Sequence, residues 1–255
     1  AFGVLYWLIR DQQSRGVSPG ALAMPTMGMT DLSTFWSFPI LQASGLVAMV
    51  TAWFVVALGL QQSRKAKSWL GMDYRTIDRL HRQLALLTLG LVIVHVVATA
   101  FDAMGDSWRT VLWFNGWASD WPDANWGYNI GIFAFYALLL LGPTFYLRRR
   151  IGVRQWKFLH RFILVFYILS IWHALILGLD ISYYSWIRPV LWLAQIPLLW
   201  LLAQRFSSLA KTNAETDKGN VRYLTSMLIV VVAYVAAVAC AAIVLTGNSG
   251  FIANV

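Results

Sequence analysis

The sequence predicts an all-α fold, a polytopic membrane bundle of about six transmembrane helices. Of the 255 residues, 59% are hydrophobic and only 12% are charged, which is far from the composition of a soluble domain. The apolar residues gather in runs of about 20, the length that an α-helix needs to cross a bilayer. Charged residues collect between these runs, so we expect the chain to cross the membrane several times, surrounded by membrane lipid.

Six apolar runs are the expected spans, at residues 37–60, 80–101, 128–147, 158–179, 186–206 and 223–246. The third should bend at Gly142–Pro143, because proline removes a helical hydrogen bond. Residues 1–36 are expected to form an extracytoplasmic or interfacial segment. Its first nine residues are too short to span, and they suit the end of a truncated helix, a signal-peptide remnant or an interfacial stretch. Residues 37–206 then form the main transmembrane domain, and 207–255 a cytoplasmic connection with one additional helix.

Basic residues mark one side of the membrane. The connections 61–79, 148–157 and 207–222, with their flanking residues, hold 16 of the 20 lysines and arginines, while the opposite side holds 7 of the 11 acidic residues. Short basic loops face the cytoplasm. We therefore expect a multi-pass protein of the cytoplasmic (inner) membrane with its basic loops inside. The net charge of +9 is then a topology signal, and no nucleic-acid partner is expected.

The four histidines of the chain fall on two of these spans. His81 and His95 stand 14 residues apart in LHRQLALLTLGLVIVH, and His160 and His173 stand 13 apart in LHRFILVFYILSIWH. Both spans run outward from the cytoplasmic side, so His81 should lie beside His160, and His95 beside His173, at levels about 20 Å apart. Thirteen residues rotate an ideal helix by about 220°. Either the second helix is irregular, or its two histidines serve groups on different sides.

Two imidazoles at each level suit haem better than a bare metal ion. A zinc site takes about four ligands, and these two spans contain no cysteine or carboxylate. Haem supplies four pyrrole nitrogens itself and needs only axial ligands. The hypothesis is two haems b, with His81 and His160 on the inner iron and His95 and His173 on the outer iron. The alternative is that each histidine only hydrogen-bonds to a neighbouring helix.

These two motifs resemble the ferric reductase-like transmembrane domain of NADPH oxidases, ferric reductases and the haem subunit of bacterial methionine-sulfoxide reductase systems. The resemblance covers about residues 37–206 and implies bis-histidine pairs on the same two helices. It also suggests Phe166 as an aromatic side chain between the haem levels, with ordinary packing as the alternative. The oxidases continue into flavin and nicotinamide domains, whereas here a polar connection leads into another expected span, without a Gly-rich dinucleotide motif.

Five further residues are candidates for contacting the cofactors. Gly90 lies between the two histidines of its helix and could let a porphyrin approach the backbone, or serve close helix packing. Arg82 and Arg161 flank the inner histidines, and Arg109 and Arg188 are among the few basic residues of the outer side. Each arginine could pair with a haem propionate, or act only as a topology charge.

The function expected from this pattern is electron transfer across the membrane through two stacked haems. Histidine on both faces of each iron implies outer-sphere transfer without substrate chemistry at the metal. The protein would be an electron-transfer membrane subunit without its own nicotinamide or flavin domain, served by a flavoprotein, another redox subunit or quinone. One alternative is a haem-bearing anchor subunit of a larger respiratory or photosynthetic complex. A rival from another class is a non-redox transporter or structural membrane subunit.

Overall fold

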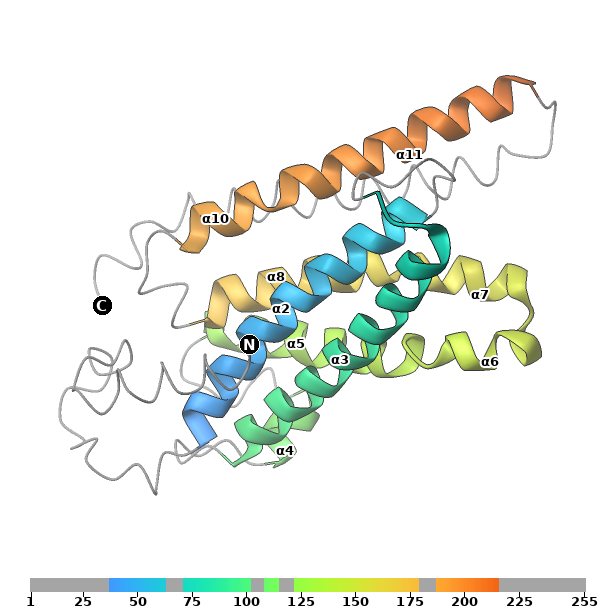
Figure 1. The fold of residues 1–255 in the computed structure, drawn as a ribbon. Helices are drawn as coiled ribbons and strands as arrows, with labels where there is room; N and C mark the ends of the chain where they lie inside the picture. The colour runs from blue at the N-terminus through green and yellow to red at the C-terminus, as the bar shows by residue number, and fades with distance from the viewer. Residues whose placement is uncertain (1–36, 63–70, 102–107, 115–121, 179–186, 216–255) are drawn as a thin grey trace.

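A computed structural model of the protein describes residues 37–62, 71–101, 108–114, 122–178 and 187–215. All of the regular structure within these ranges is helical. The helices are α2 (Ser37–Gln62), α3 (Tyr74–Ala100), α4 (Trp108–Leu112), α5 (Pro122–Leu141), α6 (Thr144–Ile151), α7 (Val153–His160), α8 (Ile163–Leu177), α10 (Ile187–Leu193) and α11 (Gln195–Glu215) (Figure 1).

Four helical segments of the described chain are long and apolar enough to cross a membrane: Pro39–Gln62, Tyr74–Ala100, Val153–Leu177 and Ile187–Arg205. A bent pair, Gly127–Leu141 with Thr144–Ile151, makes a possible fifth. The chain is therefore a helical membrane protein, with four to five candidate spans among its described residues. The sixth expected span, 223–246, and the segment 1–36 lie outside the described residues.

The expected bend at Gly142–Pro143 is confirmed, with an angle of 53° between the two helices. The amide of Gly142 still donates to Leu138 O at 2.8 Å. Pro143 has no N–H to continue the series, so α5 ends and α6 begins beyond it. The hydroxyl of Thr144 donates to the freed carbonyl of Leu141 at 2.5 Å, which satisfies one acceptor at the break.

The sequence placed residues 148–157 and 207–222 outside the spans, but 148–157 are largely helical and so is the described part of 207–222. Residues 148–157 belong to α6 and α7 and are interrupted only at Gly152, whose φ of 94° suits glycine. Arginine, lysine and glutamine are good helix formers, so their charge marks the membrane surface without ending the helix. Similarly, α11 continues to Glu215. Helix α3 begins earlier than the expected residue 80, because the Asp73 carboxylate accepts from the Thr76 amide at 3.2 Å and caps it. This bond also holds the pKa of Asp73 below its usual range.

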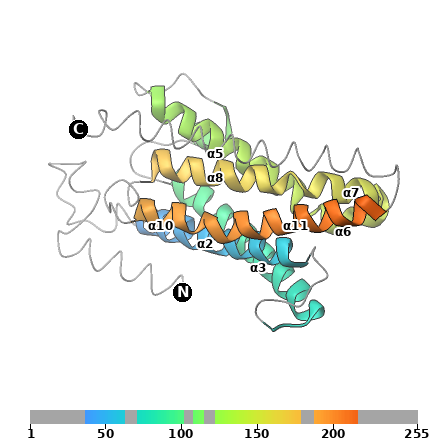
Figure 2. The same cartoon turned by 90° about the horizontal axis from the view of Figure 1, so that it is seen from above.

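The helices pack as two pairs, α2 with α3 and α5 with α8, and α11 lies along α2 (Figures 1 and 2). The hydroxyls of Thr51 on α2 and Thr88 on α3 are hydrogen-bonded at 2.9 Å in a buried position. Because Thr88 lies midway between His81 and His95 in the sequence, this bond fixes the register of α2 and α3 between the two histidine levels.

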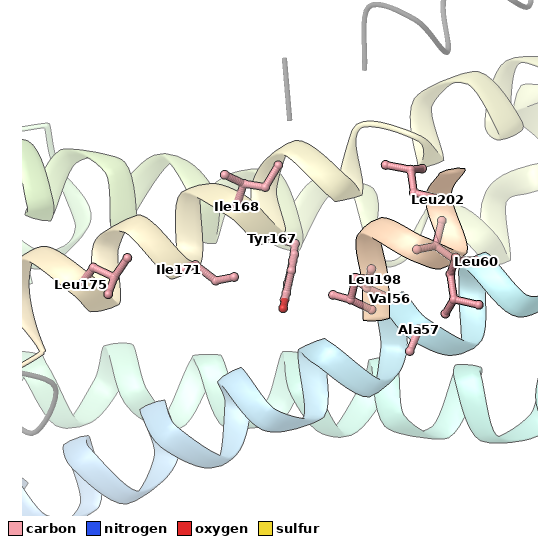
Figure 3. Close-up of a cluster of buried hydrophobic side chains, with 10 residues drawn as sticks. Val56, Ala57, Leu60, Tyr167, Ile168, Ile171, Leu175, Leu198 and Leu202 are labelled. Atoms are coloured by element: carbon pink, nitrogen blue, oxygen red, sulfur yellow. The ribbon is translucent and has the colours of Figure 1, made fainter. Parts of the chain in front are cut away.

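A buried hydrophobic cluster joins α2, α8 and α11 (Figure 3). Polar bonds reinforce it, since Tyr167 donates to Gln195 Oε1 at 3.2 Å and the Trp53 indole donates to Ala194 O at 2.6 Å. This core holds α8, and with it His173, in place relative to α2. Its members are Val56, Ala57, Leu60, Tyr167, Ile168, Ile171, Leu175, Leu198, Leu201 and Leu202.

Candidate functional site

The structure brings the four histidines together as two pairs. The rings of His81 and His160 have centroids 6.2 Å apart and planes at 83°, and the rings of His95 and His173 have centroids 6.2 Å apart and planes at 87°. The two pairs thus have nearly the same geometry. Each pair joins one histidine of α3 to one histidine of the α7–α8 segment.

On a regular helix the 13-residue spacing would put His160 and His173 on different faces. The structure has an irregular turn between α7 and α8, where amides donate to carbonyls three residues back instead of four. Residues in such a turn rotate by about 120° instead of about 100°, so the rotation from His160 to His173 exceeds the value of about 220° for a regular helix. It therefore moves toward the rotation of about 320° that 14 α-helical residues give between His81 and His95. The bonds join Arg161 N to Phe158 O (3.3 Å), Phe162 N to Leu159 O (3.1 Å), Leu164 N to Arg161 O (3.3 Å) and Val165 N to Phe162 O (2.9 Å).

The same turn also matches the two lengths. The rise per residue is about 2.0 Å in a 3₁₀ turn and about 1.5 Å in an α-helix. The greater rise in the turn therefore brings the 13 residues from His160 to His173 closer to the length of about 21 Å that the 14 residues from His81 to His95 span.

Three of the four rings are fixed by backbone carbonyls of the neighbouring helix. Nδ1 of His81 lies 3.0 Å from Val55 O, and Nδ1 of His95 lies 3.0 Å from Leu41 O. Nδ1 of His173 lies 2.9 Å from Gly127 O. A carbonyl oxygen can only accept, so Nδ1 carries the proton in each neutral ring and Nε2 keeps its lone pair. These carbonyls thus select the tautomer and orientation that a metal-binding histidine needs.

A glycine stands four residues after each of these three carbonyls. The glycines are Gly45 beside His95, Gly59 beside His81, and Gly131 beside His173. A helical side chain covers the turn before its own Cα, so a side chain at these positions would cover the carbonyl that the imidazole reaches. A Cβ at Gly131 would overlap the His173 ring, with only 2.6 Å to Cε1. The glycines therefore make the carbonyl bonds sterically possible.

His160 is held differently. No hydrogen bond joins its ring to another residue in the described part of the chain. Instead the Trp156 indole, one turn earlier on α7, stacks on it with centroids 5.2 Å apart and planes at 24°. The four rings thus have two kinds of support.

The ring separation can be compared with what a shared metal ion requires. Two metal–nitrogen bonds of about 2 Å, as at zinc–histidine sites, with about 1 Å from each nitrogen to its ring centre, place the two centroids about 6 Å apart. Both pairs match this separation. Among the described residues no three His, Cys, Asp or Glu side chains gather around a point, so neither pair has the ligands of a bare-metal site. A haem, which brings its own four nitrogens, fits the donor set.

Two buried donors add to this fit. Nε1 of Trp156 and Nε of Arg188 are buried without a partner in the described chain. An unsatisfied buried N–H is costly, and an acidic group such as a haem carboxylate would satisfy it. Trp156 adjoins the inner pair, and Arg188 is the second residue of α10, the next described helix after α8.

The other residues singled out from the sequence lie in varied settings. Phe166 is on α8 between the two levels and packs edge-on against Phe133 of α5 at 5.6 Å. Helical geometry puts Gly90 roughly 140–180° around α3 from the two histidines, with no atom within 4 Å of its Cβ position. Arg82 is exposed and pairs with Asp78 at 2.7 Å.

Two further arginines complete this set. Arg161 is half-buried and caps α7 at the tight turn. The side chain of Arg109 lies outside the described residues.

The sequence analysis did not identify Trp156 or the three glycines beside the histidine rings. We call these glycines, Gly45, Gly59 and Gly131, the cradle glycines. One signal was present, because Gly45 and Gly59 are 14 residues apart, the same spacing as His81 and His95. On antiparallel helices, equal spacing puts a glycine opposite each histidine.

The fold and the histidine pairs define a class: helical membrane proteins with paired histidines at two levels of the helix bundle. The chain belongs to the ferric reductase-like family, since the family model described as "Ferric reductase like transmembrane component" matches residues 29–171. The match contains His81, His95 and His160 and ends two residues before His173. No curated protein and no solved structure matches the chain. Domains of this family typically bind haem and act with redox subunits or domains.

Proposed function

We propose that this protein transfers electrons across the cytoplasmic membrane through two haems b, one held by His81 and His160 and the other by His95 and His173. The observation that carries the proposal is the equal 6.2 Å separation of the rings at both pairs, the distance expected for two imidazoles on one metal ion. When bound, each haem would supply a reversible one-electron couple at its own depth in the bilayer.

The residues of the chain hold and orient these groups. The carbonyls of Val55, Leu41 and Gly127 keep the proton on Nδ1 of three histidines, which directs Nε2 to the iron. A hydrogen bond to Nδ1 also makes an imidazole more basic, and so favours the oxidised metal. A haem held by one histidine of each helix would have both of its remaining ligand positions filled by the chain, which would leave none for a substrate. The protein is therefore suited to outer-sphere transfer, with the aromatic side chains of Phe133 and Phe166 packed between the levels.

The partners follow from the same arrangement. Residues 37–206 form the di-haem domain, and electrons must enter and leave it by way of another redox group. A flavoprotein, another redox subunit or quinone would supply that group. The basic residues at the α6–α7 end, which include Arg148, Arg154 and Lys157, would face the cytoplasm by the positive-inside rule. Arg188, with its buried unpartnered Nε, is the candidate to pair with a carboxylate of the outer haem.

The test is a haem count on the purified protein. A reduced-minus-oxidised spectrum should show b-type bands, and a pyridine haemochrome assay against protein mass should give two haems per chain. The double variant His81→Ala/His95→Ala, which removes one ligand from each level, is the control and should carry none. A protein purified folded and without b-type bands would sink the proposal in favour of histidines that serve only as helix contacts. One haem per chain would refute one of the two pairs.

A further inference from the structure

His160, in the inner pair, is supported differently from the other three histidine rings. Each of those rings lies against a backbone carbonyl, and a glycine stands four residues further along the helix that carries this carbonyl. On α5, Gly127 O serves His173 at the outer level. The inner level lies about 14 residues further along this helix, since the two levels are about 21 Å apart. The carbonyl there belongs to Leu141, at the bend.

At this place α5 offers His160 neither a free carbonyl nor a glycine. The Leu141 carbonyl accepts the Thr144 hydroxyl at 2.5 Å. Four residues after Leu141 stands Phe145, where the other cradles have glycine. The Phe145 ring packs edge-on against Trp156 at 5.9 Å. The bend has thus replaced a carbonyl and a glycine with an aromatic contact.

Trp156 contacts both Phe145 and His160. It lies one helical turn before His160 on α7, so its side chain and the imidazole share a face. The two rings are stacked at 5.2 Å and 24°, and Phe145 contacts the same indole edge-on. Arg148 lies over the Phe145 ring at 4.0 Å. The His160 ring therefore takes its plane from a short aromatic stack, not from a hydrogen bond.

The indole also has a donor that this packing leaves unused. Trp156 Nε1 is buried and has no partner in the described chain, although a buried indole N–H is normally hydrogen-bonded. The ring faces the inner histidine pair, and a donor there suits an acceptor carried by the group that the pair would hold. The acceptors at the edge of a haem are its two carboxylates.

We propose that Trp156 is the positioning residue of the inner level. Its indole ring fixes the plane of His160, and its Nε1–H donates a hydrogen bond to a carboxylate of the inner haem. The inference rests on the function proposed above and adds to it an inner centre built differently from the outer one. The donor offsets part of the carboxylate's negative charge. Without it, the oxidised iron is favoured and the inner midpoint potential falls.

Two substitutions separate the ring from its donor. Trp156→Phe keeps an aromatic ring against His160 and removes only the N–H, whereas Trp156→Leu removes both. Trp172→Phe is the matched control, because it removes an indole beside His173 in the sequence and not at the inner level. The readouts are haem per chain, the midpoint potentials in a redox titration, and the low-spin electron paramagnetic resonance signals, which respond to the planes of the axial rings. The inner component is the one that His160→Ala removes.

The expected results differ for each protein. Trp156→Phe should keep two haems and both resonance signals, with a lower midpoint potential of the inner component only. Trp156→Leu should also move the inner resonance signal or lower the inner haem content. Trp172→Phe should leave the inner component as in the parent. An unchanged inner potential in Trp156→Phe would overturn the hydrogen bond, and an unchanged inner signal in Trp156→Leu would overturn the positioning role. Absence of b-type haem from the parent protein is a different result and counts against the proposed function itself.

Discussion

Gly131 lies so close to His173 that a single methyl group on its Cα would overlap the imidazole, with 2.6 Å to Cε1. Two glycines of α2 have the same relation to the histidines of α3, with closest approaches of 3.0 Å from Gly45 to His95 and 3.1 Å from Gly59 to His81. Gly90, between the histidines in the sequence, has nothing within 4 Å of its Cβ position. The glycines that matter for the rings are therefore on the partner helices.

This difference predicts a graded effect of alanine. Gly131→Ala should lower the haem content of the outer level most, because the ring must move from its carbonyl, and overpacking of this kind costs about 1–3 kcal/mol. Gly45→Ala should act on the same level more weakly. Gly90→Ala is the control and should leave both haems in place. Haem per chain and redox titration of the three variants test the order, and equal losses in Gly90→Ala and Gly131→Ala would contradict it.

The tight turn between α7 and α8 predicts a tolerance to insertion. One alanine placed between Arg161 and Phe162 would raise the spacing from His160 to His173 to 14, at which a regular α-helix gives the same rotation of about 320° as between His81 and His95. We expect this variant to keep two haems.

The matched control for that insertion carries two alanines at the same place. The second residue adds about 100° of rotation, which turns one histidine away from its partner, so a haem should be lost. Haem per chain again gives the answer. A one-residue insertion that removes a haem while the two-residue insertion keeps both would show that the turn does not set the ring positions.

Separate loss of the histidines should reveal two independent levels. His95→Ala and His173→Ala should each remove the outer component, and their combination should add little, because residues that act on one site are not additive. His81→Ala with His95→Ala should remove both components. The measurement is a redox titration of the four single and two paired variants. If His81→Ala and His95→Ala each abolished the same component, the two-level arrangement would be wrong.

The orientation can be tested with single cysteines in a Cys240→Ser background. A cysteine at Arg150, which is exposed on α6, should react with an impermeant thiol reagent only from the cytoplasmic side. A cysteine at Trp113, which is 69% exposed beyond α4, should react only from the other side. The expectation comes from the 16-to-4 distribution of basic residues. Reversed labelling would reverse the assignment of inner and outer levels.

Apolar length and charge were enough to predict the four to five candidate spans of the described residues, because a bilayer imposes both on any crossing helix. The break at Pro143 was also predictable, since it is a local property of proline. Charge said less about the ends of the helices. Residues 148–157 are basic and nevertheless helical except at Gly152. Their charge could not predict this, because helices and loops at the membrane surface have similar compositions.

The details of the ring supports were out of reach of periodicity alone. The 13-residue spacing pointed to irregularity or to two different faces, and only the backbone bonds around Arg161 decide for a tight turn. The positions of these glycines depend on which carbonyl each ring reaches, and so on the register of α2 against α3 and of α5 against α8. The role of Trp156 depends on Phe145, a ring of another helix that becomes its neighbour only on folding.

The spacing of the two histidine levels also bears on the membrane voltage. At about 21 Å along the helix axis, the levels span roughly two thirds of a hydrocarbon layer of about 30 Å. One elementary charge crossing 100 mV changes its free energy by about 2.3 kcal/mol, so an electron passing between the levels would experience about 1.6 kcal/mol of this. With the basic side negative, outward transfer is favoured, by about tenfold in the equilibrium between the two levels. Electron exchange would thus be electrogenic, and a diffusion potential imposed on proteoliposomes should shift the ratio of reduced inner to reduced outer centre.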